Sequence, residues 1–184
     1  MVKLKRYQAA AVRELLVKIK KLLALDGSRR KIVFKAPTGS GKTVMAASLM
    51  ERITTEVPAD LTVPFSEVAF VWFAPNKLHE QSYFKLKAFA ETNEYINPMR
   101  WDDIDHSLNH LTHGDALFLN WESVNKDNSV IMRENEQGFT LTGIVRQTQE
   151  EQHIPVIVIV DEEHQFSKKI TPKKARNSRM MLLF

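Results

Sequence analysis

A glycine-rich segment between a β-type run and a helical stretch constrains the fold of this chain more than any other feature. The segment reads A-P-T-G-S-G-K-T at residues 36–43, after I-V-F-K-A at 32–36 and before a helical pattern from Lys42 to about Thr55. Glycine allows backbone conformations that a Cβ would block, so successive N–H groups can point at one anion, and the helix dipole adds attraction. Strand, loop and helix in this order predict a phosphate-binding loop in an α/β fold.

The alternation of strand and helix continues along the chain. V-A-F-V-W-F-A at 68–74 leads into a helical pattern from Lys77 to about Glu91, and further strands are predicted at 115–120 and 155–161. The last strand is almost continuously β-branched, which is typical of a strand buried on both faces of a parallel sheet. The predicted architecture is therefore a mostly parallel sheet with helices on both faces.

The remaining segments lie outside this alternation of strand and helix. Apolar residues recur at steps of three and four from Leu4 to Leu25, which predicts an amphipathic helix. Residues 93–113 and 122–153 fit the alternation poorly and are interpreted as insertions or long connections, with a helix from Thr140 to Gln152 inside the second.

Composition limits the classes of protein to which the chain can belong. With 184 residues, 43% apolar and 26% charged, it has the make-up of one ordinary globular domain. The sequence has no cysteine, which excludes a disulfide framework and a thiolate metal site. Charges interrupt the N-terminal region and no apolar run is long enough for a membrane span, so we expect a cytoplasmic protein with no membrane partner.

Basic residues are concentrated at the two ends of the chain. Residues 1–35 carry 11 Lys and Arg against 2 acids, and residues 165–184 carry 6 against none. Phosphate contacts by Lys and Arg supply most non-specific affinity for nucleic acid, so these ends could form such a surface. Solvated helix faces and a loose tail explain the same pattern equally well.

Side chains of the loop and of a second segment are predicted to form a nucleotide site. Lys42 would reach the β- and γ-phosphates of ATP, and Thr43 would offer its hydroxyl to Mg²⁺. Asp161 and Glu162 directly follow V-I-V-I-V, and the carboxyl end of a parallel strand is where open α/β folds bind ligands. Asp161 would hold Mg²⁺ through water, while Glu162 would orient and deprotonate the attacking water. The loop residues expected at the phosphates are Thr38, Gly39, Ser40, Gly41, Lys42 and Thr43.

Two further features each have an ordinary structural interpretation beside a functional one. Gln8 could present its amide donor and acceptor to an adenine edge, but an exposed helical Gln is the default. His106, His110 and His113 are spaced i, i+4 and i+7, so they would share a face if they lay on a helix. The spacing fits either a metal site or three histidines on a solvated face, and the solvated face is the commoner outcome.

The order of the motifs resembles that of the first RecA-like motor domain of superfamily 2 helicases. The motifs are Y-Q at 7–8, A-P-T-G-S-G-K-T at 36–43, F-A-P-N-K at 73–77, a strand ending in N-W at 120–121, and V-D-E-E-H at 160–164. The last matches the Asp-Glu-x-His box of the DEAD/DEAH type, with Glu163 where Ala is usual. Within that superfamily the chain is most similar to the restriction subunit of type III restriction enzymes, through its L-x-x-Y-Q start, its N-W-E-S-V-N-K segment and the long polar insertion before the box.

The resemblance implies a role for each matching residue. Tyr7 and Gln8 would lie at the adenine, and His164 would belong to the network that couples the nucleotide to movement. The residues that would contact the nucleic-acid backbone are Pro75, Asn76, Lys77, Asn120 and Trp121.

The resemblance also implies a function and its partners. The chain would be the ATP-hydrolysing motor of a DNA helicase or translocase, with double-stranded DNA as one partner and a modification or specificity subunit as another. A helicase that acts in DNA repair or on RNA carries the same motifs, because such motors contact the phosphate backbone and not the bases. An ATP-binding switch without translocation is a further alternative, although F-A-P-N-K and the Y-Q start favour the motor.

The motifs that follow the acidic box in the family, Ser-Ala-Thr and a second RecA-like domain with its arginine finger, are absent from the sequence. We therefore expect residues 1–184 to be an N-terminal RecA-like ATP-binding domain that is incomplete. Such a domain alone should hydrolyse ATP poorly, because an arginine finger is worth roughly a thousandfold in rate or more. Residues 165–184 are expected to be partly ordered, with an exposed apolar patch and an unpaired strand edge where the next strand would insert.

Overall fold

The computed structural model describes residues 3–25, 30–37, 39–57, 60, 66–91, 94–105, 107–125, 139–161 and 180–183. In chain order its elements are α1 (Arg6–Leu23), β1 (Arg30–Val33), α2 (Lys42–Glu56), β2 (Ala69–Ala74), α3 (Leu78–Ala90), β3 (Asn97–Arg100), the 3₁₀ turn η1 (Trp101–Asp103), β4 (Asp115–Asn120), α4 (Trp121–Asn125), α5 (Leu141–Glu150), β5 (Val156–Val160) and β6 (Met180–Leu183).

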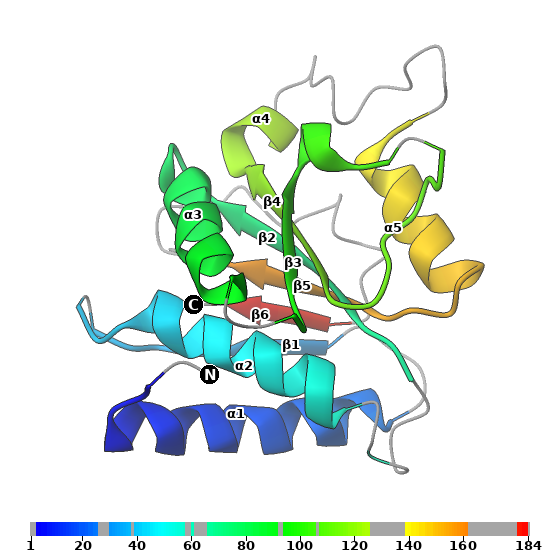
Figure 1. Ribbon diagram of the computed structural model, residues 1–184. Helices are drawn as coiled ribbons and strands as arrows, with labels where there is room; N and C mark the ends of the chain where they lie inside the picture. Colours follow the sequence, from blue (N-terminus) through cyan, green and yellow to red (C-terminus); the bar gives the residue numbers. More distant parts are fainter. Residues whose placement is uncertain are drawn as a thin grey trace.

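The strands form a single six-stranded sheet in the order β1-β6-β5-β2-β4-β3, and every neighbouring pair is parallel (Figure 1). At the centre, Val71 of β2 lies opposite Leu117 of β4 on one side and Val158 of β5 on the other. The predicted α/β fold with a parallel sheet is confirmed. The predicted strands at 68–74, 115–120 and 155–161 correspond to β2, β4 and β5 within one residue at each end.

Both faces of the sheet are covered, as the β-branched sequence predicted. Phe70 and Trp72 belong to an apolar core beneath α1, α2 and α3, whereas Val71 and Phe73 belong to a second core beneath α4 and α5. Successive residues of a strand point to opposite faces, so β2 supplies both cores in turn and is buried along its whole length.

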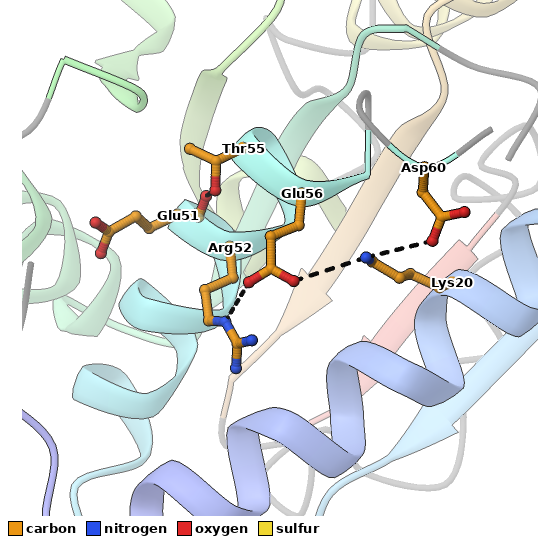
Figure 2. Close-up of polar contacts among 6 residues, drawn as sticks. All are labelled: Lys20, Glu51, Arg52, Thr55, Glu56 and Asp60. Carbon is orange, nitrogen blue, oxygen red and sulfur yellow. Dashed lines mark hydrogen bonds and ion pairs between the residues drawn. The ribbon is translucent and has the colours of Figure 1, made fainter. Parts of the chain in front are cut away.

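Helix α1 packs against α2 at the outer layer of the first core. Its buried residues, among them Val12, Leu16 and Ile19, recur at the predicted helical spacing. At the far end of α2, Lys20 of α1 lies 3.6 Å from Glu56 and 3.3 Å from Asp60 (Figure 2). The Nε of Arg52 donates to the same Glu56 carboxylate at 2.6 Å, so one acidic group joins the two helices. No helix of the described part of the chain has the length and apolarity that a membrane crossing needs.

The stretch 93–113, predicted to be an insertion or a long connection, contains a strand instead. Residues 97–100 form β3, which pairs with β4 and closes one edge of the sheet. Its sequence, N-P-M-R, hides the strand because Pro98 has no N–H to donate, and a proline is tolerated only where one side of the strand is unpaired. Tertiary contacts fix this segment: the side chain of Asn97 donates to buried Asp115 at 2.8 Å, at the start of β4.

The prediction of an unpaired strand edge near the end of the chain is wrong. Residues 180–183 are themselves a strand, β6, which pairs with β1 on one side and β5 on the other (Figure 1). Leu182 lies opposite Ile32 and Ile159, so the backbone of this apolar run fills the position between the two strands. The remainder of the predicted tail, residues 165–179 and Phe184, lies outside the described residues.

Candidate functional site

The sheet brings most of the predicted site segments to one edge. Because all strands are parallel, their carboxyl ends meet on the same side, and this is where open α/β sheets bind ligands. The glycine-rich loop follows β1, Asp161 follows β5, Pro75 follows β2, and Trp121 follows β4. Segments that are far apart in the sequence thus lie along a single edge.

The glycine-rich loop has the backbone conformation that its sequence predicts. Gly39 and Gly41 have φ angles of +79° and +84°, a region that favours glycine. Gly41 is the residue before the first turn of α2, so the free N–H groups of the helix start and the positive end of its dipole lie at the loop. This is the arrangement that binds phosphate groups in proteins.

The first turn of α1 holds this loop from outside. The Tyr7 hydroxyl and the Gln8 amide nitrogen both donate to the carbonyl oxygen of Ser40, each at 2.9 Å. The Gln8 amide oxygen accepts from the backbone N–H of Lys5 at 2.8 Å, which also closes the first turn of α1. Gln8 is 7% exposed, so it is not the exposed helical residue that its position suggests. One N–H and one lone pair of its amide remain for a ligand such as adenine.

A cavity of about 270 Å³ lies beside the loop and contains its main chemical groups. Gly39, Gly41, Lys42 and Thr43 line it from the loop and α2, and Asp161 lines it from the end of β5. The backbone N–H of Asp161 donates to Phe73 at 2.9 Å, so pairing with β2 fixes the position of this 7% exposed residue. A lysine, a hydroxyl and a carboxylate share the cavity.

These groups are suited to a nucleotide with its divalent cation. Thr43 and Asp161 supply oxygen ligands, which Mg²⁺ prefers together with substrate phosphates and water. Three residues predicted at this site, Thr38, Glu162 and His164, lie outside the described residues.

The segments predicted to contact nucleic acid are joined to each other by hydrogen bonds. Asn120 donates from its amide to the carbonyl oxygen of Asn76 at 2.8 Å, and the Glu122 carboxylate accepts from the Asn76 N–H at 2.9 Å. Asn76 and Lys77 are exposed at this edge. Trp121 is buried, with its ring 5.4 Å from that of Phe73, so its side chain holds the segment in the core.

Pro75 is buried as well. Of the predicted contact residues, Asn76, Lys77 and the half-buried Asn120 therefore have side chains that reach the surface. The hydrogen bonds among Asn76, Asn120 and Glu122 give this surface a fixed backbone, with Asn76 held at a φ of +51° that asparagine tolerates.

A second cavity, of about 380 Å³, lies next to Asn120 and is lined in part by Arg100 and Tyr83. The Arg100 guanidinium lies 3.3 Å from the Asp103 carboxylate and 5.5 Å from the centre of the Tyr83 ring. Hydrogen bonds from Arg100 lower the pKa of Asp103, and the same pair raises the pKa of Arg100. The positive charge on this wall is therefore already paired with a carboxylate.

His110 and His113 do not lie on a helix. Residues 107–113 form turns and irregular backbone, and His106 lies outside the described residues. The Nδ1 of His113 accepts from the Val68 N–H at 3.1 Å, and the Nδ1 of His110 lies 2.6 Å from the Leu108 carbonyl oxygen. Within the ranges that the structure describes, no three His, Asp or Glu residues are grouped as a metal site.

The sequence analysis missed one wall of the cavity beside the loop. Leu78, Gln81, Ser82 and Lys85 of α3 line it together with the loop. The last three lie three, four and seven residues after Leu78, which itself directly follows F-A-P-N-K. This spacing marks one face of a helix and was the signal that the sequence offered. Periodicity alone could not say which element that face meets.

A comparison with known protein families gives a match over nearly the whole chain. The family described as "Type III restriction enzyme, res subunit" matches residues 1–182. No curated protein matches the chain.

Proposed function

Because the chain belongs to the family of type III restriction enzyme res subunits, a family of helicase-type motor domains, we propose that it binds and hydrolyses ATP with Mg²⁺ to move along double-stranded DNA. One observation carries the proposal: Lys42, Thr43 and Asp161 line a single cavity with the two glycines of the loop. A cation, a hydroxyl and a carboxylate around a helix start are the parts that phosphoryl transfer needs.

Each group has a role that follows from its chemistry. The N–H groups of the loop and Lys42 bind and orient the phosphates, and Tyr7 and Gln8 hold the loop in its binding conformation. Thr43 and Asp161 would hold Mg²⁺, whose charge would offset that of the phosphates. Glu162 would take a proton from the attacking water, and His164 would connect this site to the nucleic acid.

The exposed side chains of Asn76 and Lys77, with Asn120 behind them, are proposed to contact the DNA backbone. They lie at the carboxyl edge that also holds Asp161, so the nucleotide and the DNA would meet neighbouring strands, β5 and β2. The family supports the chain being a subunit of a restriction endonuclease, with a modification or specificity subunit as its partner. The cytoplasmic location is proposed on the basis of the sequence.

The first experiment is a titration of the chain with a fluorescent ATP analogue and Mg²⁺, in the wild type and in Lys42→Ala. We expect Lys42→Ala to abolish binding without unfolding the protein, because the side chain faces the cavity. Equal melting temperatures serve as the control for folding. Unchanged affinity in a folded Lys42→Ala protein would overturn the assignment of the loop.

ATP hydrolysis is then measured without nucleic acid, with double-stranded DNA and with RNA of similar length. Stimulation by DNA is the expected result. Turnover that responds only to RNA would support the RNA-helicase alternative, and binding without any stimulation would support a nucleotide switch.

A further inference from the structure

Helix α3 forms a wall of the nucleotide cavity that the family motifs do not include. Leu78, Gln81, Ser82 and Lys85 lie on one stripe of the helix, and all four line the cavity of the phosphate loop. Ser82 is buried and Leu78 is half-buried, whereas Gln81 and Lys85 are exposed. The polar residues of α3 that line the cavity are therefore Gln81, Ser82 and Lys85. The two exposed ones, Gln81 and Lys85, carry an amide and an ammonium group one turn apart.

The two lysines in this part of α3 have different surroundings. The Nζ of Lys87 lies 3.4 Å from the Tyr83 hydroxyl and 5.7 Å from the centre of its ring. Lys85 has no hydrogen bond or ion pair with any residue that the structure describes. Two residues along a helix correspond to a rotation of about 200°, so Lys85 and Lys87 lie on nearly opposite faces. Lys85 is thus a cation at the cavity with its donors available.

The order of the strands places α3 on one side of the loop. Along the sheet edge the loop follows β1, Asp161 follows β5, and α3 follows β2, which is the neighbour of β5. The arrowheads of β5 and β6 in Figure 1 point to the side where α3 lies. A chain of phosphates that starts in the loop and extends toward Asp161 would bring its last member nearest to α3.

We propose that Lys85, together with Gln81, binds the terminal phosphate of the nucleotide and makes the cavity selective for a triphosphate over a diphosphate. The inference rests on the proposed function, because it assigns further residues to the same site. A nucleoside triphosphate keeps a net negative charge with one Mg²⁺ bound, and the described residues that line the cavity include two lysines, Lys42 and Lys85, and one carboxylate, Asp161. A charge-assisted hydrogen bond to a phosphate oxygen is among the stronger contacts that a protein can make.

The test compares Lys85→Ala with Lys87→Ala, which removes the same charge from the other face of the helix. Affinities for a non-hydrolysable fluorescent ATP analogue and for the matching ADP analogue are measured with Mg²⁺. We expect Lys85→Ala to weaken binding of the triphosphate by roughly tenfold and that of the diphosphate by less than about twofold, since one charged hydrogen bond is lost. Lys87→Ala should change neither affinity, Lys85→Arg should restore most of the selectivity, and Gln81→Ala should weaken triphosphate binding to a lesser degree.

The possible failures are distinguishable from one another. A wild-type chain that binds neither analogue would overturn the proposed function itself. A wild-type chain that binds both, with Lys85→Ala equally weakened for both or unchanged, would leave the nucleotide site standing and overturn the role of Lys85. Melting curves of each variant separate loss of contact from loss of fold, and Lys85→Arg supplies a second folded variant for the comparison.

Discussion

Gln8 connects the first helix to the glycine-rich loop through the oxygen and the nitrogen of its side-chain amide. Its amide oxygen accepts from the Lys5 N–H at the start of α1, and its amide nitrogen donates to the Ser40 carbonyl oxygen. A buried amide that lost either partner would leave a polar group unsatisfied, at a cost of about 1–3 kcal/mol. The contact therefore fixes the loop relative to α1 before any ligand binds.

Gly41→Ala should damage the loop more than Gly39→Ala, although both residues have φ angles near +80°. A Cβ at Gly41 would lie 2.5 Å from the Gln8 amide nitrogen, whereas a Cβ at Gly39 would meet no atom within 4 Å. We expect each change to cost about 1–2 kcal/mol for the left-handed backbone. Gly41→Ala should also displace Gln8 and weaken nucleotide binding further.

Chemical denaturation and titration with a fluorescent ATP analogue check this pair of variants. The contrast between them is the informative quantity, because the backbone strain is common to both. Equal losses in the two variants would show that the contact between Gln8 and the loop contributes nothing.

At the scale of elements, α3 serves two parts of the molecule with two of its faces. Tyr83 and Leu86 are buried in the core between the helices and the sheet, and Gln81 and Lys85 line the nucleotide cavity. Its N-terminus follows Asn76, which Glu122 and Asn120 hold by hydrogen bonds. One rigid helix is thus in contact with the nucleotide cavity and with the segment proposed to bind DNA.

The pair α1 and α2 gives a prediction at the scale of elements. Glu56 of α2 contacts both Lys20 of α1 and Arg52 of its own helix (Figure 2). Glu56→Gln should lower the free energy of unfolding by about 0.5–1 kcal/mol, because the network is partly exposed. Glu14→Gln is the matched control, since its single partner Lys18 lies on the same helix and both side chains are more than half exposed.

Urea unfolding at low and at high salt measures both effects. The loss in Glu56→Gln should shrink as salt rises, because screening weakens ion pairs between accessible groups. A loss that equals that of Glu14→Gln at every salt concentration would mean that the link between the two helices does not stabilise the fold.

At the scale of the whole molecule, β6 joins the two strands that lead to the nucleotide cavity. The loop follows β1 and Asp161 follows β5, and these strands do not pair with each other but with β6 between them. The relative position of Lys42 and Asp161 therefore depends on a short strand, Met180–Leu183, far along the chain. Both the stability of the sheet and the geometry of the candidate site therefore depend on β6.

Leu182→Pro should destabilise the whole domain by more than about 2 kcal/mol, because proline cannot donate to the ladder of a strand paired on both sides. It should also weaken nucleotide binding by loosening β1 from β5. Leu182→Val is the control, because a β-branched residue suits a strand, and it should cost less than about 1 kcal/mol. Thermal unfolding and nucleotide titration provide the measurements, and a stable Leu182→Pro protein with full affinity would contradict the central position of β6.

The local sequence was sufficient to predict an element wherever the spacing of its apolar residues and the chemistry of its residues indicate the same structure. The β-branched runs of β2, β4 and β5, the amphipathic α1 and the glycine loop all occur at their predicted positions, because residue type and spacing within a few residues indicate each of them. The same holds for α5, where the Thr140 side chain caps the helix by accepting from the Gly143 N–H at 3.0 Å.

The sequence by itself therefore determined the class of fold, the loop at Gly39–Thr43 and the place of Asp161 at the end of a buried strand, since these follow from residue type and spacing. Only the tertiary structure decided that N-P-M-R at 97–100 is an edge strand, that M-M-L-L at 180–183 is an inner one, and that α3 turns Lys85 toward the cavity. The physical reason is the same in all three cases. A short segment with weak local preference takes the conformation that its partners from distant parts of the chain stabilise. In the same way, the sequence of a helix shows which residues share a face, but only packing decides which neighbour that face meets.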